Sequence, residues 1–307
     1  ISTVALATRA PILLAPAMNV DMWENPLTQD NVKRLTSLRP AYCVGPGDGF
    51  LACKMTGPGR MAEPADIVEA AAALLSSHDL AGQRVLVTAG PTREALDPVR
   101  FLSNRSTGKM GFALARAALR RGARVTLIAG PTELVVPAGV EVCWVTSAQE
   151  MADATLARAA EADVVIMAAA VGDYRPREVA AHKLKKSVLG EAPTFTLTRT
   201  LDILAELGRR RRASETGRPV LVGFAAETDE VESRARQKLA DKACDLIVAN
   251  DVSAGDAGFA GDDNRVAIIG PGDETVRSEL VSKDEVAHLV LDRILAVLGG
   301  NRARTPA

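Results

Sequence analysis

The sequence predicts an α/β protein whose larger part is a doubly wound parallel sheet. From residue 83 onward, short apolar runs recur without strict alternation, as in strands that are buried on both faces. Amphipathic helical stretches separate these runs, which is typical of a sheet covered by helices on both sides. The chain has 307 residues, which is long for one domain, so we expect a second and smaller domain.

The first block, residues 1–75, is predicted to be that smaller domain. Its expected elements are a strand at Pro11–Ala15, a helix at Gln29–Leu38, a Gly- and Pro-rich loop at Gly45–Gly59 and an Ala-rich helix at Pro64–Leu75. The polar break Ser76-Ser77-His78-Asp79 then predicts a linker, which we place at residues 76–82. Because Ile1 is not Met and an apolar segment follows almost at once, the simplest interpretation is a fragment that starts in mid-domain.

The second block, residues 83–300, alternates strands with helices and ends in a tail at 301–307. Strands are expected at Arg84–Thr88, Arg124–Ala129, Asp163–Ala169, Val220–Phe224 and Leu246–Ala249, with a hairpin-like segment at Arg265–Ile269. Helices are expected at Gly108–Arg121, Ala148–Ala160, Glu230–Lys242 and Lys283–Leu298. Ser147 and Glu150 form a predicted capping box. The block is therefore Rossmann-like, and ligands of such sheets bind outside the carboxyl ends of the strands.

Composition excludes several functional classes. The 37 Lys and Arg against 38 Asp and Glu give a net charge of -1, which offers no global field for nucleic acid or an anionic membrane. Apolar runs are shorter than the about 18 to 20 residues that cross a bilayer. The four cysteines form no CxxC pair, which argues against a structural zinc site and a disulfide scaffold. A cytoplasmic enzyme is expected.

A strand runs into Gly90, where a nucleotide-binding fold would place phosphates. A nicotinamide-dependent oxidoreductase of Rossmann type is the alternative that the fold alone allows. It is disfavoured because no GxGxxG follows the strand, and an extended Asp97–Arg100 segment is expected instead. A Tyr174-xxx-Lys pair also fails, because residue 178 is Glu.

Two further segments suit a magnesium-bound triphosphate. The turn Ser103–Gly111 precedes a helix and could bind an anion with its backbone amides, although a simple capped helix start explains it equally well. Asp173 follows a strand, and Lys183, Lys185 and Lys186 come soon after. A carboxylate and clustered lysines suit metal and phosphates, while a solvated strand edge is the alternative.

The strings TAGPTREALDPVRFLSNRSTGKMG, AAAVGDYRP, HKLKK, VGFAAET and ARQKLADKACDLIVAND, with the Asp262-Asp263-Asn264 turn, resemble the phosphopantothenate-cysteine ligase family. The resemblance covers residues 82–298. It implies that CTP and Mg²⁺ activate the carboxylate of 4'-phosphopantothenate as an acyl-cytidylate, which the amine of cysteine then attacks.

The same resemblance assigns roles to individual residues. Asn104 corresponds to the Asn that holds the acyl-cytidylate, and Lys183 to the Lys of the second half-reaction. The positions that correspond to nucleotide contacts are Met167, Ala168, Ala169, Asp173, Lys183, Asp202, Ile203, Leu204, Phe224, Lys238 and Lys242, with Asp173 also expected at the metal. One departure is Thr200-Leu201 before Asp202-Ile203, where the family usually has Pro before the Asp-Ile pair, and this difference bears on the shape of the loop more than on the chemistry.

Residues 16–23, PAMNVDMW, resemble the PxMNxxMW signature of flavin-dependent cysteine decarboxylases. The resemblance implies the C-terminal part of a flavodoxin-like domain. Asn19 would bind the substrate carboxylate, and Cys53 would protonate the enethiol beside FMN. From the residues alone, Cys53 is more simply an ordinary buried thiol. The family's catalytic His lies upstream of this motif, so we expect an incomplete FMN site and no decarboxylation by this chain alone.

The expected partners are the small molecules 4'-phosphopantothenate, cysteine and CTP, with no nucleic acid and no membrane. By the same resemblance, the protein is a homo-oligomer that dimerises through the ligase domain. A non-catalytic scaffold with the Arg209–Arg212 run as a docking patch is a third hypothesis. A solvated helix end, where basic residues complement the helix dipole, explains that run better.

Overall fold

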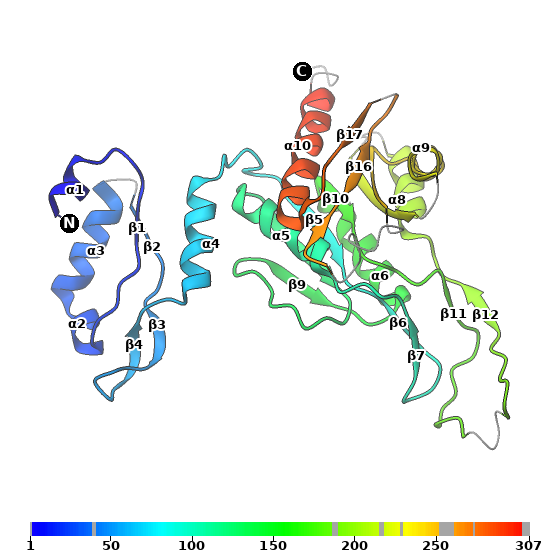
Figure 1. The fold of residues 1–307 in the computed structure, drawn as a ribbon, viewed down its shortest axis with the longest axis horizontal. Helices are drawn as coiled ribbons and strands as arrows, with labels where there is room; N and C mark the ends of the chain where they lie inside the picture. The colour runs from blue at the N-terminus through cyan, green and yellow to red at the C-terminus, as the bar shows by residue number, and fades with distance from the viewer. Residues whose placement is uncertain are drawn as a thin grey trace. The chain divides into compact units, whose positions relative to one another are not determined.

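A computed structural model of the chain describes residues 2–38, 41–185, 190–214, 218–227, 230–251, 261–272 and 274–302 (Figure 1). The chain divides into two compact units, Ile1–Ser77 and His78–Ala307. The division falls within residues 76–82, where a linker is expected. Leu80 nevertheless belongs to the second unit, because its side chain is fully buried in that core and its N–H donates to the carbonyl of Arg121 at 3.0 Å.

The first unit contains two small sheets and four helices among its described residues. They are α1 (Ser2–Ala7), β1 (Ile12–Leu14), α2 (Val20–Glu24), α3 (Pro26–Leu38), β2 (Ala41–Cys43), β3 (Gly47–Phe50), β4 (Thr56–Arg60) and α4 (Pro64–Leu75). Strands β1 and β2 are parallel, and β3 and β4 are antiparallel. The prediction of a loop at Gly45–Gly59 is therefore wrong in part, because backbone hydrogen bonds pair these glycine-rich strands without help from side chains.

The second unit is built on an eight-stranded, mostly parallel sheet. Its strands are β5 (Arg84–Ala89), β8 (Arg124–Ala129), β9 (Glu141–Trp144), β10 (Val164–Met167), β13 (Val220–Glu227), β14 (Leu246–Asp251), β16 (Val266–Ile269) and β17 (Thr275–Arg277). Their spatial order is β17-β16-β14-β13-β10-β5-β8-β9. Strands β14 to β9 run parallel, while β16 and β17 form an antiparallel hairpin at one edge. The predicted hairpin-like segment supplies only the first arm of that hairpin.

Helices cover both faces of this sheet, which confirms the doubly wound class (Figure 1). The helices are α5 (Lys109–Arg120), α6 (Ala148–Arg158), α8 (Ile203–Arg212), α9 (Val231–Lys242) and α10 (Lys283–Arg302), with a short 3₁₀ turn at Ala159–Glu161. Val85 and Val87 share a core with α5 and α10, whereas Leu86 packs with α6, α8 and α9. The predicted capping box of Ser147 and Glu150 at α6 is confirmed.

The order of the parallel strands predicts where on the sheet a ligand binds. In chain order β5, β8, β9, β10, β13 and β14 are strands 1 to 6, and in space they lie 3-2-1-4-5-6. This is the order of Rossmann folds, whose ligands bind where the order reverses. The reversal falls between β5 and β10, so the carboxyl ends of these two strands are where a site is expected.

Short hairpins project beyond the carboxyl end of the sheet (Figure 1). Strands β6 (Arg93–Ala95) and β7 (Phe101–Ser103) form one, β11 (Tyr174–Pro176) and β12 (Leu197–Arg199) form another, and β15 (Asp263–Asn264) pairs with β18 (Val281–Ser282). Over the described ranges, no helix is long and apolar enough to cross a membrane.

Candidate active site

The loops that follow β5 and β10 are joined by backbone hydrogen bonds at the switch point. The N–H of Ala170 donates to the carbonyl of Gly90 at 2.9 Å, and the N–H of Thr92 donates to the carbonyl of Ala170 at 3.3 Å. Gly90 has a φ of +80°, and a Cβ there would lie 3.2 Å from the carbonyl oxygen of Gly130. Only glycine fits this close approach of the loops after β5 and β8.

Asn104 lies over the loop after β10, although it comes from the segment before α5. Its Nδ2 donates to the carbonyls of Ala170 at 3.0 Å and Val171 at 3.3 Å. The residue is exposed. Because the amide nitrogen is engaged with the loop, the amide oxygen is the atom that Asn104 can offer to the N–H or O–H donor of a ligand.

Buried Thr92 ties the same loops together. Its Oγ1 accepts the N–H of Gly172 at 2.9 Å, and its carbonyl accepts the hydroxyl of Ser103 at 2.7 Å. The hydroxyl of Thr200 in turn donates to the carbonyl of Gly172 at 2.6 Å. Three segments that are far apart in the sequence are thereby held at fixed positions beside Asn104.

The N-terminus of α5 is the expected anion-binding turn. Its N-cap is Gly108, with a φ of +85° and no side-chain cap. The amine of Lys109 lies 2.7 Å from Asp262, in the turn that resembles the family's Asp-Asp-Asn motif. The Lys109 ammonium lowers the pKa of the Asp262 carboxyl. The Lys109 amine is therefore engaged by Asp262 as the structure stands.

Asp173 lies at the entrance of the β11–β12 hairpin and is exposed. Its carbonyl accepts the N–H of Thr200 at 3.0 Å, so the loop that leads to Asp202 runs beside it. Within the described ranges, no group of three or more His, Cys, Asp and Glu side chains could hold a metal ion. A metal role for Asp173 stays a prediction.

Asp202 and Lys242 meet where α8 begins and α9 ends. The Asp202 carboxylate caps α8 by accepting the N–H of Ala205 at 2.9 Å, and it forms an ion pair with the Lys242 amine. Lys238 lies one turn earlier on α9 and therefore on the same face as Lys242. The structure thus brings the predicted Asp202 and Lys242 together.

The other residues expected at the nucleotide are divided between the two faces of the sheet. Met167 and Ile203 are 7% and 3% exposed and pack in the core under α6, α8 and α9, beside Leu204 and Ala169. Phe224 and Ala168 pack against the core on the opposite face. The side chains of Met167 and Ile203 are therefore closed off by the core, and these two residues could meet a ligand only through their backbone.

Lys183 is exposed in the segment that connects β11 to β12. The backbone N–H of its neighbour Leu184 donates to the Asp97 carboxylate, and the carbonyl of Leu184 accepts from the Arg100 guanidinium. Lys185 is also exposed, and Lys186 lies outside the described residues. The roles of Lys183 and Lys238 remain predictions.

In the first unit, the two expected decarboxylase residues touch. The Nδ2 of Asn19 lies 3.4 Å from the Sγ of Cys53 and 3.3 Å from the sulfur of Met55, while its Oδ1 caps α2 by accepting the N–H of Asp21. Cys53 lies in the turn between β3 and β4 and is exposed, so the interpretation as a buried thiol is wrong. An amide and an accessible thiol in contact suit a substrate that carries a carboxylate and a sulfur atom.

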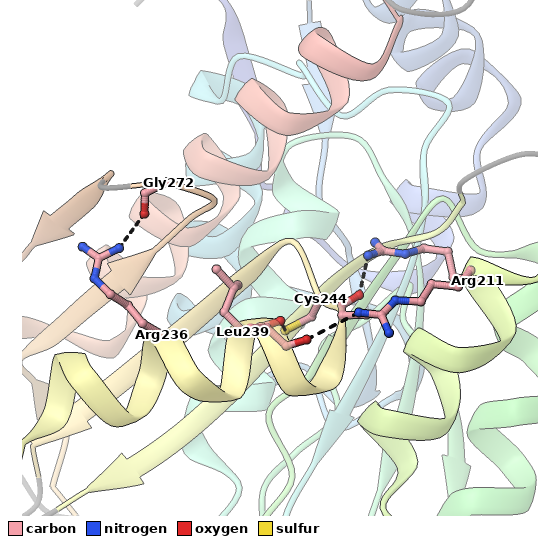
Figure 2. Close-up of a pocket in the computed structure, with 8 residues that line it drawn as sticks. Arg211, Arg236, Leu239, Cys244 and Gly272 are labelled. Atoms are coloured by element: carbon pink, nitrogen blue, oxygen red, sulfur yellow. Dashed lines mark hydrogen bonds between the residues drawn. The ribbon is translucent and has the colours of Figure 1, made fainter.

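A cavity of about 540 Å³ lies away from the switch point, at the C-terminal ends of α8 and α9 (Figure 2). Arg236 donates to the carbonyl of Gly272 at 2.6 Å, and Arg211 donates to that of Ala243. Burial raises the pKa of the Cys244 thiol to about 12, so this thiol is inert. Because these arginines already bind backbone carbonyls, Arg211 at the end of α9 and Arg236 between β16 and β17, this hollow is structural rather than an anion site.

The Arg209–Arg212 run does end a helix, α8, as expected. Arg209 and Arg210 are exposed and pair with Glu206. The interpretation of the whole run as solvated is wrong for Arg211, whose side chain is only 14% exposed and pairs with Asp245. Arg211 joins the end of α8 to the start of β14.

Sequence reasoning missed the role of Asp97 and Arg100. The segment Asp97–Arg100 is a turn rather than extended, because the Oδ1 of Asp97 accepts the N–H groups of Val99 and Arg100, both at 2.8 Å. The N–H of Leu96 also donates to the carbonyl of Arg100 at 2.9 Å, which closes the β6–β7 hairpin. Asp followed by Pro is a turn signal that could have identified it.

The strand order and the loops gathered at its switch point define a Rossmann-like α/β protein. Residues 80–298 match the family described as DNA/pantothenate metabolism flavoprotein C-terminal domain, and residues 1–76 match the family described as Flavoprotein. The coenzyme A biosynthesis bifunctional protein CoaBC of Bacillus subtilis is 46% identical over 302 residues, which cover 97% of this chain and 72% of that protein. The chain belongs to this family of coenzyme A biosynthesis enzymes.

Other relatives agree. CoaBC of Mycobacterium tuberculosis is 46% identical over 306 residues, covering 96% of this chain and 72% of that protein. A crystal structure of the C-terminal domain of a CoaBC protein is 41% identical, with a TM-score of 0.61, and covers 73% of this chain and 100% of that chain. A Cab2 variant bound to phosphopantothenate-cysteine, 17% identical with a TM-score of 0.57, covers 79% of this chain and 96% of that chain and shares the fold. The oxidoreductase alternative is not supported.

Proposed function

We propose that the second unit ligates cysteine to 4'-phosphopantothenate with CTP. The substrate carboxylate attacks the α-phosphorus of CTP and displaces pyrophosphate, which gives an acyl-cytidylate. The amine of cysteine then attacks the acyl carbon, CMP leaves with the electron pair of the broken C–O bond, and the amine loses a proton. Atoms and charges balance without a covalent enzyme intermediate.

The observation that carries this proposal is the position of Asn104. An exposed carboxamide anchored on Ala170 and Val171, at the switch point of a Rossmann-like sheet, lies where such folds bind nucleotides. There it would orient the acyl-cytidylate for attack. Holding the two reactants in place supplies much of the acceleration of a reaction of this kind.

Lys238, Lys242 and Asp202 would form the nucleotide side of the site. The amines of Lys238 and Lys242 project from one face of α9. The ion pair with Asp202 holds the Lys242 amine at the start of α8. We propose that the triphosphate lies against them, where fixed positive charges stabilise the negative charge that moves to pyrophosphate.

Asp173 is the residue that we propose for Mg²⁺. A single exposed carboxylate fits this ion, because Mg²⁺ in nucleotide sites is held by one or two carboxylates, phosphate oxygens and water rather than by a protein cage. When bound, Mg²⁺ would neutralise charge on the phosphates. The contribution of the chain is then the placement of Asp173 beside the loop that leads to Asp202.

Together with the remainder of its FMN site, the first unit would act on the product, phosphopantothenoylcysteine, with Asn19 binding its carboxylate and Cys53 protonating the enethiol that remains after carbon dioxide leaves. The match of residues 1–76 to the Flavoprotein family supports a flavin cofactor, and we propose FMN. When bound, the flavin would take up and return a hydride. The contact of Asn19 with Cys53 supports their shared site.

We also propose that the enzyme is cytoplasmic and dimerises through the second unit. Exposed apolar side chains gather on the two hairpins beyond the sheet: Val99, Phe101, Leu102, Tyr174 and Leu197. Strand β11 also contacts β6, so these side chains belong to neighbouring hairpins. A second copy of the chain is the partner that would cover them.

The test of the ligase proposal measures pyrophosphate release with CTP, phosphopantothenate and Mg²⁺. Release that requires phosphopantothenate is expected, and NAD(P)H turnover without it would contradict the proposal. Replacing Lys183 with Gln should let the acyl-cytidylate accumulate without ligation. Lys185→Gln is the matched control, because it removes an equal charge two residues away and should ligate at a nearly normal rate.

A further inference from the structure

The segment that carries Lys183 is held by an ion pair on the β6–β7 hairpin. The N–H of Leu184 donates to the Oδ2 of Asp97 at 3.1 Å, and the guanidinium of Arg100 donates to the carbonyl of Leu184 at 2.8 Å. Both backbone polar groups of the residue after Lys183 are thus fixed. Since neighbouring Cα atoms lie about 3.8 Å apart, fixing Leu184 also restricts where Lys183 begins.

Burial and several hydrogen bonds stabilise the ion pair between Asp97 and Arg100. The Asp97 side chain is fully buried, and its Oδ2 accepts from the Nε of Arg100 at 3.0 Å and the Nη2 at 2.6 Å. The Arg100 guanidinium, helped by the N–H groups of Val99 and Leu184, holds the pKa of the Asp97 carboxyl well below its usual range. The Asp97 carboxyl is therefore ionised at every pH at which the enzyme would be active.

A second bond supports the same arrangement. The N–H of Ala180 donates to the carbonyl of Leu96 at 3.1 Å, so the hairpin turn holds the segment at two positions, 180 and 184. The same hairpin ends at Ser103, next to Asn104. One rigid element therefore sets the separation between Asn104 and the backbone beside Lys183.

The two oxygens of Asp97 have different partners, which separates a local from a long-range role. Oδ1 accepts the N–H groups of Val99 and Arg100 and so closes the turn. Oδ2 faces the Arg100 side chain and Leu184, which is 87 residues away in sequence. A turn alone would need only the first oxygen.

We propose that Asp97 is a positioning residue for the ligation step: with Arg100 it holds the Lys183 segment so that the Lys183 amine reaches the acyl-cytidylate retained by Asn104. This inference rests on the proposed ligase function. It predicts that loss of Oδ2 affects the attack by cysteine more than the formation of the intermediate.

The experiment replaces Asp97 with Asn in the full chain. The amide keeps an oxygen for the turn but puts a donor where Arg100 and Leu184 also donate. The control is Asp163→Asn at the opposite end of the sheet, since Asp163 also is buried and accepts from a backbone N–H, that of Arg84 at 2.9 Å, and from an arginine, Arg218 at 3.1 Å. Acyl-cytidylate and ligated product are measured in single turnovers, with hydrogen exchange of the Leu184 amide.

For Asp97→Asn we expect the ligation step to slow about tenfold or more, as for loss of a charged hydrogen bond, while the intermediate accumulates and the Leu184 amide exchanges faster. Asp163→Asn should leave the ratio of intermediate to product unchanged. Equal ratios in wild type and Asp97→Asn, or an unchanged Leu184 amide, would overturn the proposal. If the wild-type protein released no pyrophosphate in response to phosphopantothenate, the ligase function would be refuted instead. Hydrogen exchange of the Leu184 amide would still test whether Asp97 holds Leu184.

If Asp97→Asn fails to fold, Leu184 offers a second pair of variants. Leu184→Pro removes the N–H that donates to Asp97, while Leu184→Ala keeps it. The proposal expects Leu184→Pro to accumulate acyl-cytidylate and Leu184→Ala to ligate normally. Ligation by Leu184→Pro at the rate of Leu184→Ala would contradict it.

Discussion

Gly111 is the position where one added methyl group should disturb both stability and the candidate site. It lies in the first turn of α5, where a Cβ would meet the Cβ of Ala89 at 2.5 Å, the Cα of Ala89 at 2.9 Å and the carbonyl oxygen of Thr88 at 2.9 Å. Two of these atoms belong to the backbone of β5. Neither can rotate out of the way.

The size of the effect follows from two opposing contributions. Carbon atoms in contact normally lie about 3.5 to 4.0 Å apart, so Gly111→Ala would push α5 from β5 by about 1 Å. Ala gains about 1 kcal/mol over Gly in a helix, whereas overpacking of a core costs about 1 to 3 kcal/mol. Because backbone atoms make the contact, we expect the upper part of that range and a net loss of about 1 to 2 kcal/mol.

Thermal denaturation of the full chain, followed by the signal of the second unit, measures this loss. A fall in Tm of about 2 to 8 °C is expected for a unit of this size. Gly299→Ala in α10 is the control, since nothing lies within 4 Å of its added Cβ, and it should stabilise by about 0.5 to 1 kcal/mol. If Gly111→Ala raised Tm as Gly299→Ala does, the close approach of α5 to β5 would be refuted.

Four further outcomes test the site and its surroundings. Asn104→Asp should weaken retention of the acyl-cytidylate about tenfold or more, measured as intermediate released to solution, because a negative charge replaces the anchoring amide. Iodoacetamide at pH 8 should label Cys53 but not Cys244 in the native protein and both in urea. Because burial raises the pKa of Cys244 to about 12, its thiol ionises first in the unfolded chain, so the free energy of unfolding should fall as pH rises above about 9. Phe101→Glu should shift the protein toward monomer in sedimentation, whereas Val135→Glu, at a side chain that is 86% exposed, should not.

Much of the larger unit could be predicted from the sequence because its strands are continuous apolar runs. All four residues of Val164–Met167 are buried, and their composition alone indicates a central strand. The short strands of the hairpins escaped prediction because they are exposed and obtain their pairing from a turn. Asp97–Arg100 is the clearest case: Pro98 favours extended backbone at Asp97, and the Asp97 carboxylate nevertheless folds the next residues into a turn.

The candidate site was predictable only in part. Motif resemblance predicts roles for Asn104 and Lys183, and the structure shows what Asn104 contacts. The resemblance could not identify the hydrogen bond from Leu184 to Asp97. That contact joins residues 87 positions apart and depends on where two hairpins lie in space. Met167 and Ile203, which the resemblance assigns to the nucleotide site, have side chains that fill the core, so their place at a ligand stays a prediction about their backbone.

The buried position of Leu80 determines where the second unit can be cut from the chain. The strand pattern begins at Gln83, which would be the natural first residue of a shortened version. Such a version would lack a side chain that is completely enclosed, and the space it leaves would be flanked by Arg121 at the end of α5. Cleavage before His78 keeps the Leu80 side chain in the core of the second unit. We therefore expect proteolysis to release this unit intact only where it cuts on the N-terminal side of Leu80.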